Sequence, residues 1–425
     1  MRTATSRIAA GLIDGCAARG AWHELFPLAQ RHKLAGVVAH ALRAGRSDAP
    51  AAIAAEAERV LERARHQAAR LVPELAGVVE ALRVAGVPAL AVKGPAQSAL
   101  LYGDPDLRSS LDLDLLIARR DLRSAAACLE RLGYAARPRA DGLAREIHFV
   151  NPRRGFVVDL HWNIVGGDIP FPLDFATLWA ERQAVALGGG TIDVPGTAWL
   201  TVLSGLYLVK EYPWVDLTYL ADLEQLARRV TLADLACVGE IATATGTRRI
   251  TALAFTLLRR YGIDTRAPVA GDAAVERLAD RLERALADPH HRRKRLYWHR
   301  LATLLSHVAF RERIADRLRV IAALPAFLLL PDMNDAERAA AEGRSLWAAR
   351  LRRLPEVAAT LLAARPGAWT AWRTPSPIRG PGSSRRRASS SSCSTMPGSC
   401  STRPARSCSP CRRPRPSSGA HSWRA

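Results

Sequence analysis

Two aspartates, Asp112 and Asp114, lie two positions apart in the otherwise apolar stretch Leu111–Ile117. This alternation predicts a strand, in which residues two apart point to the same face. Leu111 and the leucines that alternate with the acids would then face a core. Two neighbouring carboxylates repel each other unless a cation neutralises them. The pair therefore indicates a site for Mg²⁺, with Mn²⁺ as the alternative, although two solvated acids on an exposed strand face would give the same pattern.

A third carboxylate, Asp159, lies in a second apolar stretch that is predicted to form a strand, Phe156–Trp162. Three carboxylates that hold two metal ions are a common device for transferring nucleotidyl groups, because the attacking and leaving oxygens both need neutralising. His161 lies on the same strand face as Asp159. It could hydrogen-bond that carboxylate or a phosphate, or it could be a core histidine, and these alternatives stay open.

Short strands and helices are expected around these acids. Gly86-Val87-Pro88 ends a helix, and Ala89–Val92 reads as a buried strand followed by a turn at Lys93-Gly94-Pro95. Further elements follow from the same kind of pattern: a helix from Pro95 to about Tyr102, a helix at Arg120–Leu132, strands at Glu146–Val150 and Phe156–Trp162, and a turn at Gly188-Gly189-Gly190.

Helical periodicity dominates the flanks of this region. Residues 1 to about 80 carry apolar side chains at helical spacing, and so does the chain from Trp199 to about Arg365, most clearly at Leu200–Arg229 and Ala273–Ala287. From about Pro375 the chain is Ser, Arg and Pro with almost no aliphatic residues, which predicts disorder. This tail is either a basic arm that binds a polyanion or a stretch read out of frame.

The charge balance narrows the classes of partner. The net charge is +21, and ten of the arginines lie from Pro375 onward, which leaves +11 on the first 374 residues. A basic surface favours polyanions such as nucleotides. No stripe of Arg and Lys with interleaved aromatics appears in the body, so nucleic acid is an unlikely partner. No apolar run is long enough for a membrane span, and we expect a cytoplasmic protein.

Several motifs together resemble a known family. They are Val92-Lys93-Gly94, Leu101–Pro105, Leu107-Arg108, Asp112–Leu116, Leu132-Gly133-Tyr134 and Val158–Trp162, followed by Lys210, Trp214 and Leu217–Leu223. In this order they resemble the bacterial family of uncharacterised nucleotidyltransferases, which belongs to the DNA-polymerase-β-like superfamily. The resemblance is good over residues 80–230, loose over the flanking helices and absent from the tail.

The resemblance implies a role for each matching residue. Asp112, Asp114 and Asp159 match the catalytic carboxylates that hold metal. The nucleotide-binding candidates are Lys93, Gly94, Ser98, Arg108, His161 and Lys210. Gly94 lets the backbone approach the triphosphate, while Lys93 and Arg108 are suited to phosphate contact. Arg108 could instead anchor its loop against Asp104 or Asp106, and Lys210 could pair with Asp222 or cap a helix.

Two departures from the family pattern stand out. Many superfamily members have Gly-Ser before the paired acids, whereas here Pro95 follows Gly94, which leaves Ser98 as the candidate for the serine contact. Relatives often carry a His where this chain has Tyr207. Both differences concern nucleotide or acceptor recognition and leave the three carboxylates intact.

The expected fold is α/β (α+β): a small mixed-sheet nucleotidyltransferase core flanked by helical segments. The expected boundaries are a helical segment 1–80, the core 81–198, a helical domain 199–370 and a tail 371–425. The expected function is Mg²⁺-dependent transfer of a nucleoside monophosphate, from a nucleoside triphosphate such as ATP, to a hydroxyl of an unknown acceptor. The alternatives are an inactive protein of this fold that binds a nucleotide or a partner, and a basic nucleic-acid-binding protein.

Overall fold

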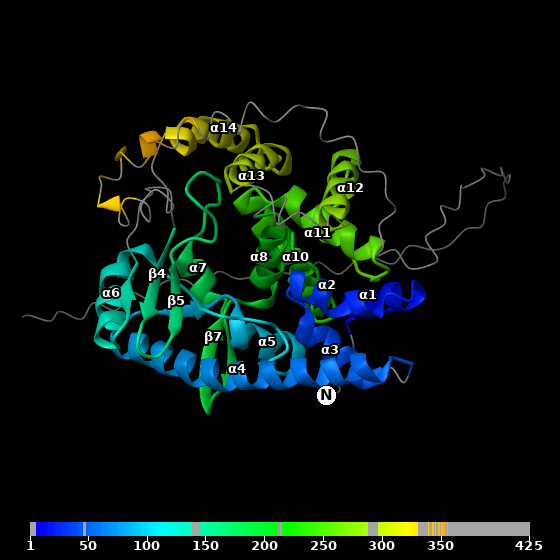
Figure 1. The fold of residues 1–425 in the computed structure, drawn as a ribbon. Coiled ribbons are helices and arrows are strands. Elements are labelled where there is room, and N and C mark those ends of the chain that lie inside the picture. Colours follow the sequence, from blue (N-terminus) through cyan, green and yellow to red (C-terminus); the bar gives the residue numbers. More distant parts are fainter. Residues whose placement is uncertain are drawn as a thin grey trace, which may run out of the picture. The chain divides into compact units, whose positions relative to one another are not determined.

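The structure is a computed structural model that describes residues 6–45, 48–137, 145–210, 212, 215–287, 296–329 and scattered positions between 339 and 355. The described residues all lie in one compact unit within residues 1–382 (Figure 1). The predicted tail, residues 371–425, lies outside the described residues.

Four helices open the chain. Their bounds are α1 Arg7–Ala18, α2 Leu25–Arg31, α3 Ala35–Gly45 and α4 Ala51–Val84, with a 3₁₀ turn at Trp22–Glu24 before α2. The start of α1 is fixed by a distant carboxylate. Glu224 accepts hydrogen bonds from the Ser6 hydroxyl and the Arg7 backbone N–H, each at 2.7 Å. The first backbone N–H groups of a helix have no partner inside it, so Glu224 caps α1 and joins it to α9, Leu217–Ala227.

The central sheet has five strands in the order β1-β2-β5-β4-β3. The strands are β1 Ala89–Ala91, β2 Leu113–Ile117, β3 Ala135–Ala136, β4 Glu146–Asn151 and β5 Phe156–His161. β2 and β5 run parallel, whereas the other three pairs are antiparallel. Helix α5, Gly94–Tyr102, follows β1, and α6, Leu122–Arg131, follows β2 after a 3₁₀ turn at Arg119–Asp121.

The two faces of the sheet have different neighbours. Leu113, Leu115, Val158 and Leu160 point to a core that also contains side chains of α4 and α6. Leu116, on the opposite face, belongs to a second core together with α8 and the other C-terminal helices. The polar residues of β2 and β5 lie on this second face, which turns toward α8.

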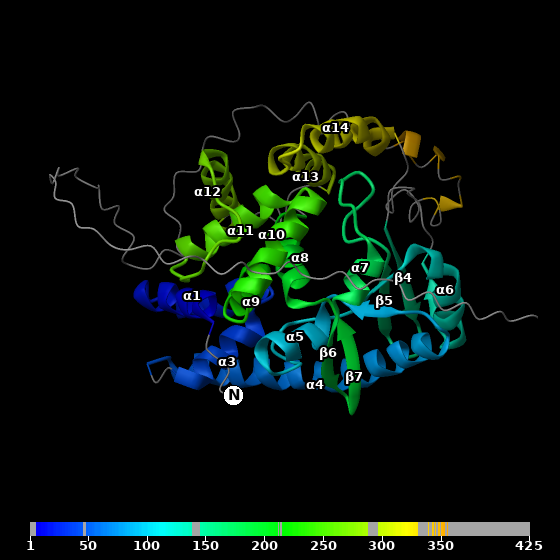
Figure 2. The same cartoon turned by 180° about the vertical axis from the view of Figure 1, so that it is seen from behind.

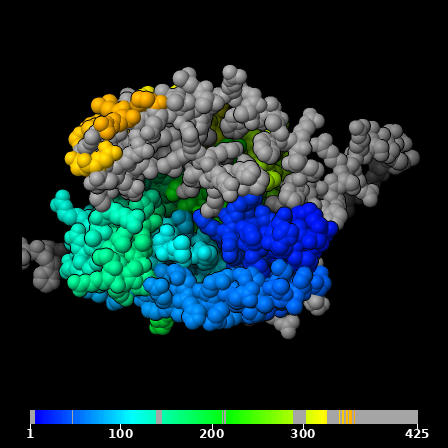
Figure 3. Space-filling view, in the orientation of Figure 1, coloured from blue at the N-terminus to red at the C-terminus, as the bar shows by residue number. Residues whose placement is uncertain are grey.

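Helix α4 contributes to both cores. Its first half buries residues such as Val60 in the core of the terminal helices, and its second half buries residues such as Leu75 under the sheet. Figures 1 and 2 show α4 running from α3 to β4, β5 and α6. Its outer face carries ion pairs such as Arg83–Glu80 at 2.6 Å, and it forms the light-blue band of surface in Figure 3.

The remainder is mostly helical. Helix α7, Phe175–Ala180, precedes a hairpin of β6 Gln183–Leu187 and β7 Gly190–Val194. The later helices are α8 Thr197–Lys210, α9 Leu217–Ala227, α10 Leu232–Thr245, α11 Arg248–Arg260, α12 Ala273–Ala287, α13 Leu296–Phe310 and α14 Ile314–Leu329. Among the described residues, none of these helices has the length and apolar character needed to cross a membrane.

The expected α/β core between helical segments is confirmed, but one detail of its central strand is wrong. We predicted a strand at Leu111–Ile117 with Leu111 in the core. The strand begins at Leu113, and Leu111 is 77% exposed. Leu111 and Asp112 belong instead to the loop that enters the strand, because the ladder with β5 starts only at the Leu113–Val158 pair. Asp112 therefore reaches the site from a loop.

Candidate active site

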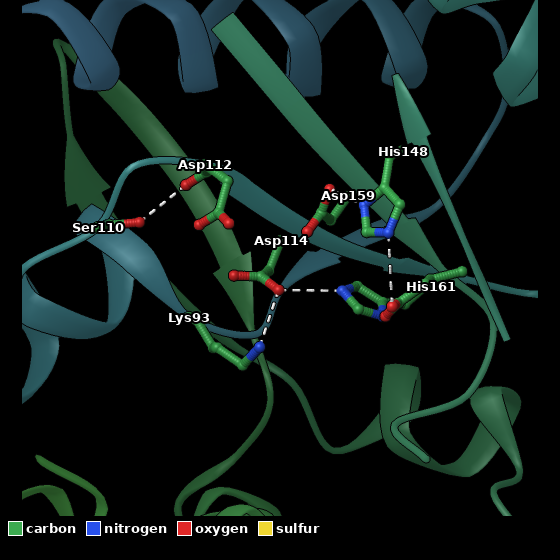
Figure 4. Close-up of polar contacts among 8 residues, drawn as sticks. Lys93, Ser110, Asp112, Asp114, His148, Asp159 and His161 are labelled. Carbon is green, nitrogen blue, oxygen red and sulfur yellow. Dashed lines mark hydrogen bonds and ion pairs between the residues drawn. The ribbon is translucent and has the colours of Figure 1, made fainter. Parts of the chain in front are cut away.

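Three predicted carboxylates meet on the sheet face that turns toward α8. Asp114 lies in β2 and Asp159 in β5, and the parallel register places the two residues directly beside each other. Asp112 precedes β2 by one residue, and its carboxylate points to the same region in Figure 4. The hydroxyl of Ser110 donates a 2.8 Å hydrogen bond to the Asp112 carbonyl, which fixes the loop there.

Asp114 is the carboxylate with the most contacts. Its side chain is 7% exposed, and Oδ1 accepts hydrogen bonds from Lys93 Nζ and His161 Nε2, both at 2.9 Å. Burial acts to raise the pKa of Asp114, but the charges and hydrogen bonds of Lys93 and His161 outweigh it and hold that pKa well below its usual range. Asp114 is therefore ionised, with two internal counter-ions.

Asp112 lies in the opposite electrostatic situation. Burial and the negative charges of Asp114 and Asp159 raise its pKa above the ordinary value, and Lys93 offsets this only in part. An acid whose ionisation is opposed by two neighbouring acids is a place where an added cation is strongly stabilised. Asp112 therefore marks a place in the site where burial and neighbouring carboxylates together oppose ionisation.

Strand β4 supplies two residues that the sequence analysis did not select, Glu146 and His148. The antiparallel register pairs His148 with Asp159 and Glu146 with His161. His148 Nδ1 lies 2.5 Å from Asp159 Oδ1, and this hydrogen bond raises the pKa of His148. The sequence contained a signal for these residues. Glu146 and His148 lie two positions apart in a predicted strand, the same spacing that pointed to Asp112 and Asp114.

His161 does not hydrogen-bond Asp159, which was one of the alternatives left open. Its side chain is 4% exposed and lies between Asp114 and Glu146. Nδ1 is 2.9 Å from Glu146 Oε2, close enough for an ion pair, although its angle falls short of a hydrogen bond. Burial lowers the pKa of His161, but the two carboxylates prevail and raise it. His161 is thus a buried histidine with carboxylates at both ring nitrogens, which agrees with the core-histidine alternative.

Lys93 and Gly94 form the entry to α5 beside the acids. Lys93 is the residue just before the helix. Its ammonium donates a hydrogen bond to Asp114 and lies 4.7 Å from the centre of the Tyr207 ring. Gly94 has φ +71°, a conformation that residues with a side chain rarely adopt. A Cβ there would lie 3.3 Å from Ser110 Oγ. Gly94 thus lets α5 begin directly against the loop that carries Asp112.

Lys210 contributes to the other wall of the site. It ends α8, and its ammonium lies 5.9 Å from the Tyr207 ring centre. Tyr207 in turn stacks on Tyr219 of α9, with ring centres 5.4 Å apart. Burial acts to raise the pKa of Glu146, but His161 and, to a smaller extent, the charge of Lys210 hold that pKa below the ordinary value. Trp214, which belongs to the same family motif, lies outside the described residues.

Arg108 and Ser98 are held in structural contacts instead of pointing to the acids. Arg108 Nε donates a 2.8 Å hydrogen bond to Asp222 Oδ2, and Tyr102 donates its hydroxyl proton to Asp222 Oδ1 at 2.8 Å. The Ser98 hydroxyl donates to the Asp104 carbonyl at 2.6 Å and accepts from the Arg108 backbone N–H at 3.0 Å. These four side chains tie α5 and its following loop to α9.

Two of the sequence-based alternatives are thereby corrected. Arg108 does not anchor its loop through Asp104 or Asp106, because its guanidinium reaches α9. Asp222 does not pair with Lys210, because it is fully buried against Arg108 and Tyr102. The contacts run between residues more than a hundred positions apart, which no local spacing could indicate.

One compact set of ligand atoms in the described chain is suited to a metal ion. Single atoms of Asp114, Asp159 and His161 all lie within 4.8 Å of one another. Two carboxylates and an imidazole are an ordinary donor set for a divalent ion. Next to this set, burial and the charges of Asp114 and Asp159 raise the pKa of Asp112. The residues present therefore fit a divalent cation, with Asp112 beside the set.

Comparison with known proteins now identifies the family. The sequence profile of a family described as "Uncharacterised nucleotidyltransferase" matches residues 19–262, which is more than half of the chain. The chain belongs to this family. The match includes every predicted site residue of this nucleotidyltransferase family member, from Lys93 to Lys210, and it extends over the N-terminal helices α2 to α4. A search of curated proteins found no match.

Two solved structures are similar at low identity. One is the solution structure of the antibiotic-resistance factor ANT(2'')-Ia, with 12% identity, a TM-score of 0.31 and coverage of 41% of this chain and 90% of that one. The other is an antigenic nucleotidyltransferase-like protein from Paracoccidioides brasiliensis. It has 16% identity, a TM-score of 0.30 and coverage of 49% of this chain and 96% of that one.

Proposed function

We propose that this protein transfers a nucleoside monophosphate from a nucleoside triphosphate to a hydroxyl group of a small molecule, sugar or protein. The observation that carries the proposal is the parallel register that sets Asp114 beside Asp159, with Asp112 next to both. Membership of a nucleotidyltransferase family supports it. ATP as the donor and the cytoplasm as the location are parts of the proposal that rest on the sequence alone.

The triphosphate would lie at the start of α5. The first turn of a nine-residue helix presents backbone N–H groups that bind anions, and Gly94 removes the side chain that would block the approach. Lys93 adds a positive charge at the same place. Lys210 and the Tyr207 ring form the side of the site toward the C-terminal helices, where we place the acceptor.

Asp112, Asp114 and Asp159 would hold the divalent ion, which neutralises charge on the phosphates and the leaving group when bound. In the reaction, the acceptor oxygen forms a bond to the α-phosphorus and the bond from that phosphorus to the bridging oxygen of pyrophosphate breaks. Asp159 takes the proton of the acceptor hydroxyl. His148, hydrogen-bonded to Asp159, holds this carboxylate in place. Positioning and charge neutralisation account for most of the expected acceleration.

Nucleotide binding without turnover is a second candidate, and one observation favours it. The serine contact to the triphosphate that the family resemblance implies is not supplied by Ser98, whose hydroxyl is buried and engaged with Asp104 and Arg108. A site with metal ligands but an incomplete phosphate cradle binds nucleotide and transfers it poorly.

The full-length protein separates these candidates in two assays. Thermal unfolding with each of the four nucleoside triphosphates, with and without Mg²⁺ or Mn²⁺, reports binding, since a ligand at 100 times its dissociation constant stabilises by about 2.7 kcal/mol. Pyrophosphate release in the presence of a small-molecule cell extract reports turnover. We expect metal-dependent stabilisation by one triphosphate and release of pyrophosphate.

Each other outcome has a definite meaning. Stabilisation without pyrophosphate release for any extract fraction favours the binding protein. No stabilisation by any triphosphate contradicts both candidates, and salt-sensitive binding of oligonucleotides would then support the nucleic-acid alternative. Asp280→Asn is a matched control for Asp-to-Asn variants of the site. Arg260 of α11 pairs with three carboxylates of α12, and the variant removes one of them. It should leave nucleotide binding and pyrophosphate release unchanged.

A further inference from the structure

His161 has the surroundings of a metal ligand. Its Nε2 belongs to the compact donor set with Asp114 and Asp159, and its side chain is almost fully buried. The other ring nitrogen, Nδ1, lies 2.9 Å from a carboxylate oxygen of Glu146. Metal-binding histidines nearly always direct their second nitrogen to a carboxylate, a carbonyl or water, which fixes the ring and selects the tautomer with a lone pair on the metal side.

The strand register explains why this arrangement forms. Glu146 on β4 is the antiparallel neighbour of His161 on β5, so the carboxylate stands beside the ring. Asp114 on β2 lies across from Asp159 on β5, two residues before His161. The carboxylate, the imidazole and the two aspartates therefore come from three adjacent strands on one sheet face, as Figure 4 shows for the labelled residues.

His148 provides a natural comparison within the same site. It also lies against an aspartate, but its side chain is 33% exposed and its Nε2 is 3.7 Å from Glu146. It does not belong to the compact set of donor atoms among the described residues. The two histidines thus differ in burial and in the contact at the second nitrogen, and only His161 combines both features of a ligand.

We propose that His161 Nε2 is a ligand of the divalent ion together with Asp114 and Asp159, with Glu146 orienting the ring, and that the site consequently prefers Mn²⁺ to Mg²⁺. This inference rests on the proposed metal-dependent function. Mg²⁺ requires hard oxygen ligands and near-ideal octahedral geometry, whereas first-row transition metals accept imidazole nitrogen. Binding of the ion would release the Nε2 proton to solvent and free Nε2 and Asp114 Oδ1 to act as ligands, while Nδ1 would keep its proton toward Glu146.

Electron paramagnetic resonance of the full-length protein with Mn²⁺ tests the proposal without reference to activity. Pulsed measurements detect nitrogen bonded to Mn²⁺, and labelling the protein with ¹⁵N-histidine changes that signal in the wild type without any mutation. We expect the histidine nitrogen signal in the wild type and in His148→Asn, and its loss in His161→Asn. Titration should show that Mg²⁺ competes weakly with Mn²⁺ in the wild type.

Affinity changes sharpen the assignment. Loss of a carboxylate that orients a metal ligand usually costs about 10–100-fold in metal affinity. Glu146→Gln should therefore weaken Mn²⁺ binding by about tenfold or more and leave Mg²⁺ binding less affected. His161→Asn should weaken Mn²⁺ binding at least as much as Glu146→Gln does, and it should reduce the preference of the site for Mn²⁺ over Mg²⁺. His148→Asn removes a partner of Asp159 but no nitrogen ligand, so it should weaken the binding of both ions alike and leave the preference unchanged. The control Asp280→Asn should change neither quantity.

The contrary results are distinct from a failure of the proposed function. Mn²⁺ bound without a histidine nitrogen signal, or a signal lost in His148→Asn and kept in His161→Asn, overturns the role of His161 while the metal site stands. Mn²⁺ and Mg²⁺ binding equally well overturns the preference. No binding of Mn²⁺, with or without a nucleoside triphosphate, overturns the metal-dependent function together with this inference.

Discussion

Two buried clusters of charge contact α5, one at its start and one around Asp222 of α9, and they are built in different ways. The cluster around Asp222 balances one guanidinium, Arg108, against one carboxylate, and the Tyr102 hydroxyl donates a hydrogen bond to the second carboxylate oxygen. The cluster at the start of α5 contains two lysines, Lys93 and Lys210, and two histidines beside four acids: Asp112, Asp114, Glu146 and Asp159. The first cluster is a single matched pair, whereas the second crowds four carboxylates together, and the pKa of Asp112 is raised by burial and by two of the other acids.

This difference separates a structural role from a functional one. A buried ion pair costs desolvation energy, which its own attraction and hydrogen bonds offset only when the partners match. Arg108 and Asp222 meet that condition and hold the α5 loop on α9. The acids around Asp112 do not, as the raised pKa of Asp112 shows. Such an arrangement is expected where a cation from solution completes the site.

The largest effect is expected for Asp114→Asn, because it damages both function and stability. It removes the acid that neutralises Lys93 and His161, and unpairing a buried charge costs about 3 kcal/mol or more. Transfer should fall by about 100-fold or more, the usual loss when a main electrostatic contact to the transition state is removed. Urea unfolding and pyrophosphate release measure the two effects. An unchanged unfolding free energy would contradict the internal counter-ion role.

Asp222→Asn should destabilise by a similar amount without touching the acids. It leaves Arg108 buried without its charge partner, at a cost of about 3–5 kcal/mol. At temperatures where the variant stays folded, we expect Mn²⁺ affinity close to that of the wild type. Thermal unfolding and Mn²⁺ titration report the two quantities. A loss of metal affinity larger than the loss of stability would show that the matched cluster belongs to the site.

Gly94→Ala should have an intermediate effect. A residue with a side chain at φ +71° is strained by about 1–2 kcal/mol, and the added carbon lies 3.3 Å from Ser110 Oγ. We expect a moderate fall in melting temperature and a larger fall in nucleoside triphosphate affinity than in Mn²⁺ affinity. Equal losses of both affinities would place Gly94 outside the phosphate site.

Glu80→Gln on the outer face of α4 should have the smallest effect. Its ion pair with Arg83 is exposed to solvent, where such pairs contribute little. The melting temperature should stay within experimental error of the wild type, and so should both ligand affinities. A clear destabilisation would mean that surface pairs contribute more here than the contrast between the two buried clusters assumes.

The sequence predicted the three carboxylates because each can be recognised from a short stretch of chain. Asp112 and Asp114 are two residues apart, and Asp159 lies in a short apolar strand, so alternation and residue type sufficed. The exact start of β2 was missed because the hydrophobicity of Leu111 continues the pattern beyond the first hydrogen-bonded pair with β5. Leu111 is exposed for that reason.

The partners of those acids were not predictable in the same way. Glu146 and His148 become part of the site only because the antiparallel register places them beside His161 and Asp159. Asp222 meets Arg108 across 114 positions of sequence. Strand register and helix packing decide these contacts, and a single sequence gives neither. Residue type therefore located the carboxylates, and tertiary structure decided which cations neutralise them.

The central claim is that the folded site opposes the ionisation of Asp112 until a cation binds. Asp112→Asn tests it most directly, through thermal unfolding at neutral pH with and without Mn²⁺ and a nucleoside triphosphate. Because the pKa of Asp112 is raised in the folded chain, its ionisation destabilises the fold as pH rises through the ordinary value toward the raised one, and this penalty persists at neutral pH. The variant should thus melt above the wild type without ligands and below it with both ligands. A variant that melts below the wild type in both conditions would contradict the account.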